Sequence, residues 1–332
     1  MDKIKNKLGK YWHVKCILAL LVAFFPLLVG GMAGASYINM IACFILVYTI
    51  AASGFDILYG YCGQISLGHA GFFAIGAYGA AILDKTVGVP QWIAILIACF
   101  AAVVVAAIVA YPAANLRFHF LSLATIAFGE IVYSFICASP GNITGNFVGF
   151  FPSKLSVFGI VLDDYTKFFY VSLILVVITL VIKENLIHSK TGRAMVAIRE
   201  NVVAAGGMGI NVRSYKIMAF CTSAFFVAFS GAMYGYLTRY LNPSTFIYDQ
   251  SVMFLTMLLF GGSGTLWGPV LGVMTVQLIN EGLRDFAQYQ TLFYGVAILV
   301  VVLFMPSGLV NLKLGGKKKN KENKESEVAK DA

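Results

Sequence analysis

Charged side chains are scarce in this sequence, and this scarcity excludes an ordinary water-soluble domain. Only 12% of the 332 residues are Asp, Glu, Lys or Arg, against about 25% in soluble domains, while 59% are hydrophobic. Apolar runs of about 20 residues recur along the chain, which is the length that crosses the hydrocarbon of a bilayer. The runs lack the two-residue alternation of a membrane β-barrel strand. We therefore predict an all-α polytopic membrane protein with about 8–10 transmembrane helices.

Motifs for catalysis, nucleotide hydrolysis and metal binding are also missing. No G-x-x-x-x-G-K-[ST] segment is present, so we expect no ATP hydrolysis on this chain. No Ser/His or His/Glu constellation indicates an enzyme. The six cysteines stand singly in apolar segments, without metal-ligand or CxxC spacing, and we expect them to be small core residues. They are Cys16, Cys43, Cys62, Cys99, Cys137 and Cys221.

Ten apolar segments are candidate membrane spans. They lie near residues 15–33, 37–59, 64–83, 91–111, 120–138, 166–183, 216–238, 250–262, 266–281 and 290–306. The eighth and ninth are short and are separated by the glycine-rich segment GGSGTLWGP, so they form either two tilted helices or a re-entrant hairpin.

The basic residues lie mainly outside the spans and on one side of the membrane. With ten spans, 19 of the 24 Lys and Arg residues fall on the side that holds both termini and residues 184–215, and five fall on the other side. Positive charge accumulates on the cytoplasmic side of membrane proteins. We therefore expect cytoplasmic N- and C-termini and a cytoplasmic 184–215 loop. The net charge of +9 then reflects topology and does not indicate nucleic-acid binding.

The spans and loops divide the chain into five segments. They are a basic cytoplasmic N-terminus (1–14), an N-terminal transmembrane half (15–183), a cytoplasmic loop (184–215), a C-terminal transmembrane half (216–310) and a charged tail (311–332). We expect the tail to be disordered, with its lysine run near anionic lipid headgroups. The first apolar run leaves two alternatives open: a retained helix, which its length favours, or a signal peptide cleaved after Ala33-Gly34-Ala35.

Small residues dominate the third span. On a helix they would form one continuous stripe, with glycines thinning the surface beside it. The stripe consists of Ser66, Ala70, Ala74, Ala77 and Ala81, and the glycines are Gly68, Gly71, Gly76 and Gly79. Small residues let helix backbones approach closely in lipid, so this span is expected to be buried against other helices.

Several polar residues lie within or beside apolar spans and need partners or water. Gln64, Ser66 and His69 open the small-residue span, which suits a passage for a polar solute; the alternative for His69 is a core histidine satisfied by its neighbours. Glu130 lies mid-span, where a charge costs about 2.5–3.5 kcal/mol. We expect Glu130 to face the protein interior, either on the passage or opposite a partner helix. Asp56 lies closer to the membrane boundary and is interpreted as interfacial.

A second glycine-rich segment interrupts the apolar run at 250–281. Its breaks are Gly261, Gly262, Gly264 and Gly268, followed by Pro269. Broken helices at membrane depth are tolerated only where protein buries them or where they line a cavity. Two glycine-rich segments in two halves of a chain are typical of transporters, and we expect these glycines to act in helix packing and gating.

Four longer blocks stand out in order along the chain. They are GYCGQISLGHAGFFAIGAYGAA (60–81), KTGRAMVAIRENVVAAGGMGINVRSYKIMAFCTSAFFVAFSGAMYG (190–235), LLFGGSGTLWGPVLGV (258–273) and FMPSGLV (304–310). Together they resemble the permeases of branched-chain amino-acid ABC importers, in particular the M-type subunit. The resemblance implies a permease in a bacterial-type plasma membrane that imports leucine, isoleucine or valine and holds no cofactor itself. It also implies partners: a related permease, two cytoplasmic ATPases that bind ATP and Mg²⁺, and an extracytoplasmic substrate-binding protein.

In this resemblance the 184–215 loop receives the motion of the ATPases. A short amphipathic helix from Gly192 to Ala205 would dock its apolar face in a groove of an ATPase. The residues expected to carry the coupling are Arg193, Arg199, Glu200, Asn201, Ala204, Ala205 and Gly209. The sequence departs from the family at Gly206 and Gly207, because members of the family often have Glu and Ala at these two positions. Two glycines cost a helix about 2 kcal/mol, so we expect the coupling helix to end near Ala205.

Three alternatives remain open. The same family pattern serves importers of urea, amides and nucleosides. An ion-coupled secondary transporter would require more ionisable residues within the membrane than Glu130. A membrane scaffold without transport would not need the polar residues from Gln64 to His69.

Overall fold

The computed structural model describes residues 34–113, 118–157 and 160–284, together with Pro26, Leu292, Gly295, Val296 and Leu299. The charged tail, Cys16 and the FMPSGLV block lie outside the described residues, as do nearly all of the first and tenth expected spans.

Five helices in the described part of the chain are long and apolar enough to cross a membrane. They are α3 (Ala35–Asp56), which continues into the π-helical turn η1 (Ile57–Tyr61), α5 (Gln91–Ala113), α6 (Phe118–Ala138), α7 (Tyr165–His188) and α10 (Val212–Thr238). At 1.5 Å per residue, helices of 21 to 27 residues reach roughly 32–40 Å, enough to span the hydrocarbon. The all-α membrane-protein class predicted from the apolar runs is confirmed.

Three shorter helices pack with these in the described part of the chain. They are α4 (His69–Ile82), α11 (Tyr248–Gly261) and α12 (Gly268–Gly282). The predicted breaks at the glycines are confirmed, because α11 ends at Gly261 and α12 begins at Gly268. The two helices pack closely: a Cβ placed on Gly272 would collide with the carbonyl of Met257, and one placed on Gly261 with that of Gly268. The eighth and ninth spans are therefore two short helices joined by a glycine-rich turn.

The third span begins later than the sequence predicts. Its helix α4 starts at His69, and residues 62–68 have no helical structure. Gly63 adopts a positive φ of 70°, which ends the preceding π-helical turn. Ser66 therefore does not lie on the helix, and the stripe of small residues starts at Ala70.

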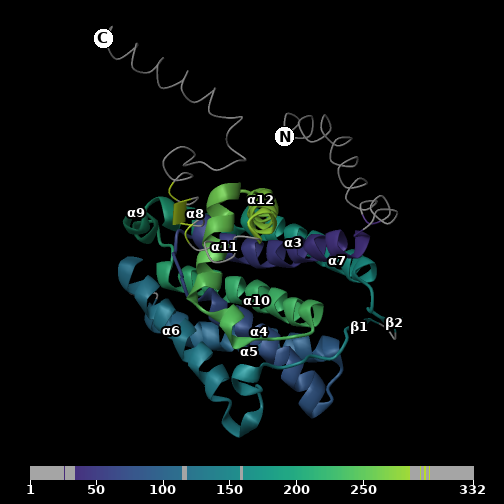
Figure 1. Ribbon diagram of the computed structural model, residues 1–332. Helices are drawn as coiled ribbons and strands as arrows, with labels where there is room; N and C mark the ends of the chain where they lie inside the picture. Colours follow the sequence, from purple (N-terminus) through teal and green to yellow (C-terminus); the bar gives the residue numbers. More distant parts are fainter. Residues whose placement is uncertain are drawn as a thin grey trace, which may run out of the picture.

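The helices are arranged in layers (Figure 1). α3 lies beside α7 and α12, α10 lies in the middle, and α4 and α5 lie on its other side with α6 at the edge. α10 contacts α3, α4 and α5, so the two halves expected from the sequence share one core. Tyr37 joins the start of α3 to the end of α12. It donates a hydrogen bond to Glu281 and accepts one of 2.6 Å from Arg284.

Close contact between α4 and α10 confirms that the small-residue helix is buried. A Cβ placed on Gly76 would collide with the carbonyl of Ala228, and one placed on Gly231 with the carbonyl of Phe73. The two helix backbones therefore touch at these glycines. Ala74 is completely buried within the same contact.

Irregular segments connect the helices on the side of the molecule away from α8 and α9. They are η2 (Leu83–Val87), η3 (Pro140–Asn142), η4 (Asn146–Val148), η5 (Pro243–Phe246) and the antiparallel pair β1 (Ser156–Val157) and β2 (Ile160–Val161). Lys154 pairs with Asp163 at 2.6 Å in this region, and the hydrogen bond from Lys154 lowers the pKa of the Asp163 carboxyl. Both side chains are exposed, so this ion pair contributes little to stability.

Candidate functional site

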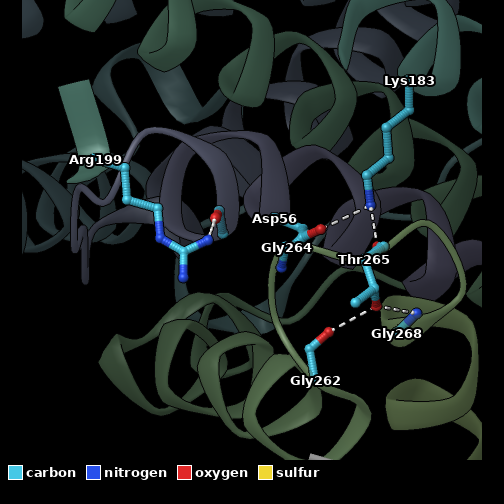
Figure 2. A network of polar contacts seen from close by, with 8 residues as sticks. Asp56, Lys183, Arg199, Gly262, Gly264, Thr265 and Gly268 are labelled. Carbon is cyan, nitrogen blue, oxygen red and sulfur yellow. Dashed lines mark hydrogen bonds and ion pairs between the residues drawn. The ribbon is translucent and has the colours of Figure 1, made fainter. Parts of the chain in front are cut away.

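A buried ion pair lies where α3 ends. Lys183 Nζ, from α7, is 2.8 Å from Asp56 Oδ2, and neither side chain is exposed. Each charge has a further partner in the loop between α11 and α12 (Figure 2): Asp56 Oδ1 accepts a 2.8 Å hydrogen bond from the Gly264 amide, and Lys183 donates one of 3.2 Å to the Thr265 carbonyl. Such extra bonds offset part of the desolvation cost of a buried pair.

The loop between α11 and α12 is held in one shape. Thr265 Oγ1 donates a hydrogen bond to the Gly262 carbonyl and accepts one of 2.9 Å from the Gly268 amide (Figure 2). Gly262 and Gly264 have φ values of 100° and 72°, which residues with a Cβ rarely adopt. Glycine is therefore needed at both positions for the Gly264 amide to reach Asp56.

Arg199 connects the 184–215 segment to the same network. Its guanidinium donates a short hydrogen bond to the carbonyl of Gly60, in the π-helical turn that directly follows Asp56 (Figure 2). A Cβ on Gly264 would lie 2.9 Å from Arg199 Nη1 and 3.0 Å from the Gly60 carbonyl oxygen. The π-helical turn, the glycine-rich loop and Arg199 therefore meet at one point, which we call the Asp56 network (Asp56, Gly60, Lys183, Arg199 and Gly262–Gly268).

Two helices, and not one, follow α7. α8 (Lys190–Glu200) begins with Ser189 accepting a hydrogen bond from the Gly192 amide, and α9 (Val202–Gly207) begins with Asn201, whose Oδ1 accepts hydrogen bonds from two amides at 3.0 Å. The expectation of one helix ending near Ala205 is wrong. Asn201 is a strong N-cap residue, and α9 runs through Gly206 and Gly207.

The apolar side of α8 packs against this chain itself. Met195 and Ile198 are each 1% exposed, so they are not free to enter a partner's groove as the sequence predicts. The exposed apolar side chains lie further along: Val203 on α9 is 84% exposed, and Met208 directly after it is 83% exposed. These two residues are absent from the set expected from the sequence.

The other residues expected to carry the coupling lie on α8 and α9 or directly after them. Arg193 donates a 2.8 Å hydrogen bond to the His188 carbonyl and is otherwise exposed, as are Glu200 and Ala204. Ala205 is buried, and Gly209 has a φ of 82°. Of the whole set, Arg199 reaches the Asp56 network.

Ser66 and His69 form a buried cluster on the other side of the π-helical turn. The two ring nitrogens of His69 lie 2.8 Å from Ser66 Oγ and 2.8 Å from Ser223 Oγ on α10. The rings of Phe55, Phe72 and Phe220 surround the imidazole. Both polar atoms of the imidazole therefore have partners within the chain, as in the core-histidine alternative.

The irregular segment at 62–68 has its own polar support from neighbouring helices. Thr125 Oγ1 on α6 accepts a 3.1 Å hydrogen bond from the Leu67 amide, and Ser251 on α11 accepts one of 2.8 Å from the Ala70 amide. Gln64 is also buried, although its side-chain oxygen has no hydrogen-bond partner in the described part of the chain. The segment is thus a non-helical stretch buried by protein, as membrane depth requires.

Glu130 does not join this cluster. It lies on α6 with its side chain exposed on the surface of the chain, whereas the sequence predicts that it faces the interior. A hydropathy pattern places a residue along a span but does not say which face the rest of the chain covers.

Sequence reasoning missed the ion pair at the centre of the site. The sequence places Asp56 at the membrane boundary and does not single out Lys183, yet both side chains are completely buried. The available signal was one acidic and one basic residue, each near the same end of an apolar span. Their pairing is not visible in the sequence because 127 positions separate them.

The comparisons with known proteins agree with one another. The family model described as "Branched-chain amino acid transport system / permease component" matches residues 37–305. The high-affinity branched-chain amino acid transport system permease protein LivM of Escherichia coli is 29% identical over 81% of this chain and 69% of its own length. BraD of Pseudomonas aeruginosa, a permease protein of the same kind of system, is 24% identical over 79% of this chain and 91% of its own. No solved structure matches the chain.

Proposed function

This chain belongs to the branched-chain amino acid transport system permease component family, and we propose that it carries leucine, isoleucine and valine across the plasma membrane as one permease subunit of an ABC importer. The structural observation that carries the proposal is the Asp56 network. Through Arg199, the network connects α8 to the π-helical turn η1, and through Asp56 it connects that turn to the loop between α11 and α12. A permease driven by separate ATPases requires such a connection.

The proposed assembly contains further subunits. A related permease pairs with this chain, two ATPases that bind ATP and Mg²⁺ contact its cytoplasmic side, and a substrate-binding protein delivers the solute on the other side. The charge distribution supports a cytoplasmic position for α8 and α9 and for both termini. Several similar proteins are named as permease proteins of transport systems, which supports an assembly of several components.

The coupling step begins at α9. Val203 and Met208 are exposed apolar side chains that suit a hydrophobic groove on an ATPase. A displacement of α9 moves α8, because the two helices are joined at Asn201. Arg199 then carries the displacement to the Gly60 carbonyl and thus to the π-helical turn. Asp56, at the start of that turn, holds the glycine-rich loop and α7.

The passage is proposed to lie beside the irregular segment that precedes α4. Gln64, Ser66 and His69 are buried in the conformation described here, so a solute reaches them only after the helices shift. The hydrogen bonds of His69 to Ser66 and Ser223 favour a role in holding α4 against α10. Glu130 is the passage residue that is already exposed on the chain's surface.

Uptake by the reconstituted importer tests the proposal. Proteoliposomes that contain the complete complex should accumulate labelled leucine when ATP is present, and should not accumulate uridine or urea. Uptake of uridine or urea in place of leucine would favour the related importers of those solutes. Accumulation by this chain alone, driven by an ion gradient, would instead establish a secondary transporter.

A further inference from the structure

One face of α6 is left uncovered by the rest of the described chain. Much of α6 is exposed, as are large parts of α5 and α7, whereas α3 is mostly buried. The exposed residues recur every three or four positions, which places them on a single face. They are Phe120, Leu123, Ala127, Glu130, Ile131, Ser134, Phe135 and Ala138.

This face differs from the exposed faces of α5 and α7 in carrying a carboxylate near its middle. In the middle of α5 and α7 the exposed side chains are apolar, as expected for contact with lipid. They include Ile97, Phe100 and Val104 on α5 and Ile174, Val177 and Ile178 on α7. The α6 face combines large apolar side chains (Leu123, Ile131 and Phe135) with the small residues Ala127 and Ser134, and Glu130 lies among them.

Glu130 cannot be accommodated by lipid without a large cost. It is the eleventh residue of the 19-residue span from Phe120 to Ala138, which places its carboxylate near the middle of the bilayer. A charge at that depth is unfavourable and almost always faces a bundle interior or water. Within the described part of the chain, no basic side chain forms an ion pair with Glu130. Within the described part of the chain no side chain covers Glu130, and the related permease of the proposed assembly is the partner that we consider for this face.

We propose that the related permease subunit covers this α6 face across a water-lined passage, where Glu130 accepts hydrogen bonds from the ammonium group of the transported amino acid. This inference rests on the proposed function. An ionised carboxylate has only acceptor atoms and binds an ammonium group with charge-assisted hydrogen bonds. The small residues Ala127 and Ser134 leave room beside it for a solute, and the adjacent Ile131 provides an apolar contact for an aliphatic side chain. Neutral urea and the uncharged nucleosides carry no ammonium group, so Glu130 acts as a specificity-determining residue.

Replacement of the carboxylate by an amide tests the recognition step. In the complete reconstituted importer, Glu130→Gln should lower kcat/KM for leucine uptake by about 10- to 100-fold, the equivalent of the 1.5–3 kcal/mol for a hydrogen bond to a charged group. Glu130→Asp should retain more activity than Glu130→Gln, because it keeps the charge. Val177→Ala, on the exposed apolar face of α7 and outside the proposed site, should change uptake less than twofold. Equal uptake by wild type and Glu130→Gln would overturn the ammonium role.

Labelling tests the surface itself and does not depend on which solute is carried. In an importer whose chain lacks its native cysteines, Glu130→Cys should react with a charged, water-soluble thiol reagent. Addition of leucine-loaded binding protein should change the rate of this labelling reaction. Ile97→Cys and Ile178→Cys are the matched controls on α5 and α7 and should remain unreactive. If Glu130→Cys is as unreactive as these controls, the α6 face contacts lipid and the proposal is wrong. If Glu130→Cys reacts in an assembly that does not carry leucine, the proposed function is contradicted, but the conclusion that water lines this surface is still supported.

Discussion

Lys183 Nζ lies 2.8 Å from Asp56 Oδ2, and the exposed fraction of each side chain is 0%. The pair links α3 to α7 and, through Gly264 and Thr265, both helices to the loop between α11 and α12. Three segments that are distant in sequence thus depend on one carboxylate and one ammonium group. This arrangement makes the stability of the bundle sensitive to either residue alone and less sensitive to loss of both.

Asp56→Ala is therefore expected to be strongly destabilising. Removal of the carboxylate leaves the Lys183 ammonium buried without its counter-charge, which lowers the free energy of unfolding by about 3–5 kcal/mol. The double variant Asp56→Leu/Lys183→Met should recover most of this loss, because it leaves no unpaired charge. Thermal unfolding in detergent, carried out as a double-mutant cycle, measures the coupling. Additive losses in the two single variants would show that the side chains do not interact as described.

Arg199 and Arg193 form a matched pair for testing the coupling route. Both lie on α8, but Arg199 bonds to Gly60 in the π-helical turn, whereas Arg193 bonds to the His188 carbonyl within its own segment. Arg199→Ala should lower ATP-driven leucine uptake at least several-fold while ATPase subunits still co-purify. Arg193→Ala should leave uptake nearly unchanged. An equal effect of the two substitutions on uptake would mean that the Arg199–Gly60 hydrogen bond does not couple the movement of α8 to the π-helical turn.

The exposed apolar residues of α9 give a separate prediction for assembly. Val203→Glu and Met208→Glu should weaken co-purification of the ATPases, because each places a charge in an apolar contact. Neither should alter thermal unfolding of the isolated chain, since the native side chains are 84% and 83% exposed. Lys190→Gln, at the opposite end of the two-helix segment, is the control. If the Glu variants retain their ATPases as fully as this control does, another surface binds them.

The boundaries of the long helices could be predicted from the sequence because hydropathy is a local property. Apolar runs end where the helices end to within a few residues, as for 91–111 against Gln91–Ala113. The start of α4 could not be predicted in this way. The segment from Gly63 to Gly68 is apolar enough to continue a helix, but hydrogen bonds from other helices, such as that between Leu67 and Thr125, stabilise a non-helical path.

The candidate site was predicted less well because its contacts are tertiary. Arg199 was expected in the coupling set from the resemblance, but its partner at Gly60 is 139 positions away. The division at Asn201 did have a local signal, because asparagine is one of the preferred N-cap residues. For Glu130, hydropathy gave the depth in the span, and the packing of the other helices gave the exposed face.

The contact between α4 and α10 provides the sharpest test of the packing. Gly76→Ala and Gly231→Ala each add a methyl group that meets a backbone carbonyl, of Ala228 and Phe73 respectively. Backbone atoms cannot move aside as a flexible side chain can, so each substitution should lower the unfolding free energy by about 1–3 kcal/mol. Gly207→Ala is the matched control: no atom lies within 4 Å of the added Cβ, and α9 should be unaffected or slightly stabilised because alanine favours helix. Thermal unfolding of the three variants in the same detergent measures the difference. If Gly76→Ala unfolds at the same temperature as Gly207→Ala, the two helices are further apart than described, and the tight packing expected from the small residues of α4 is absent.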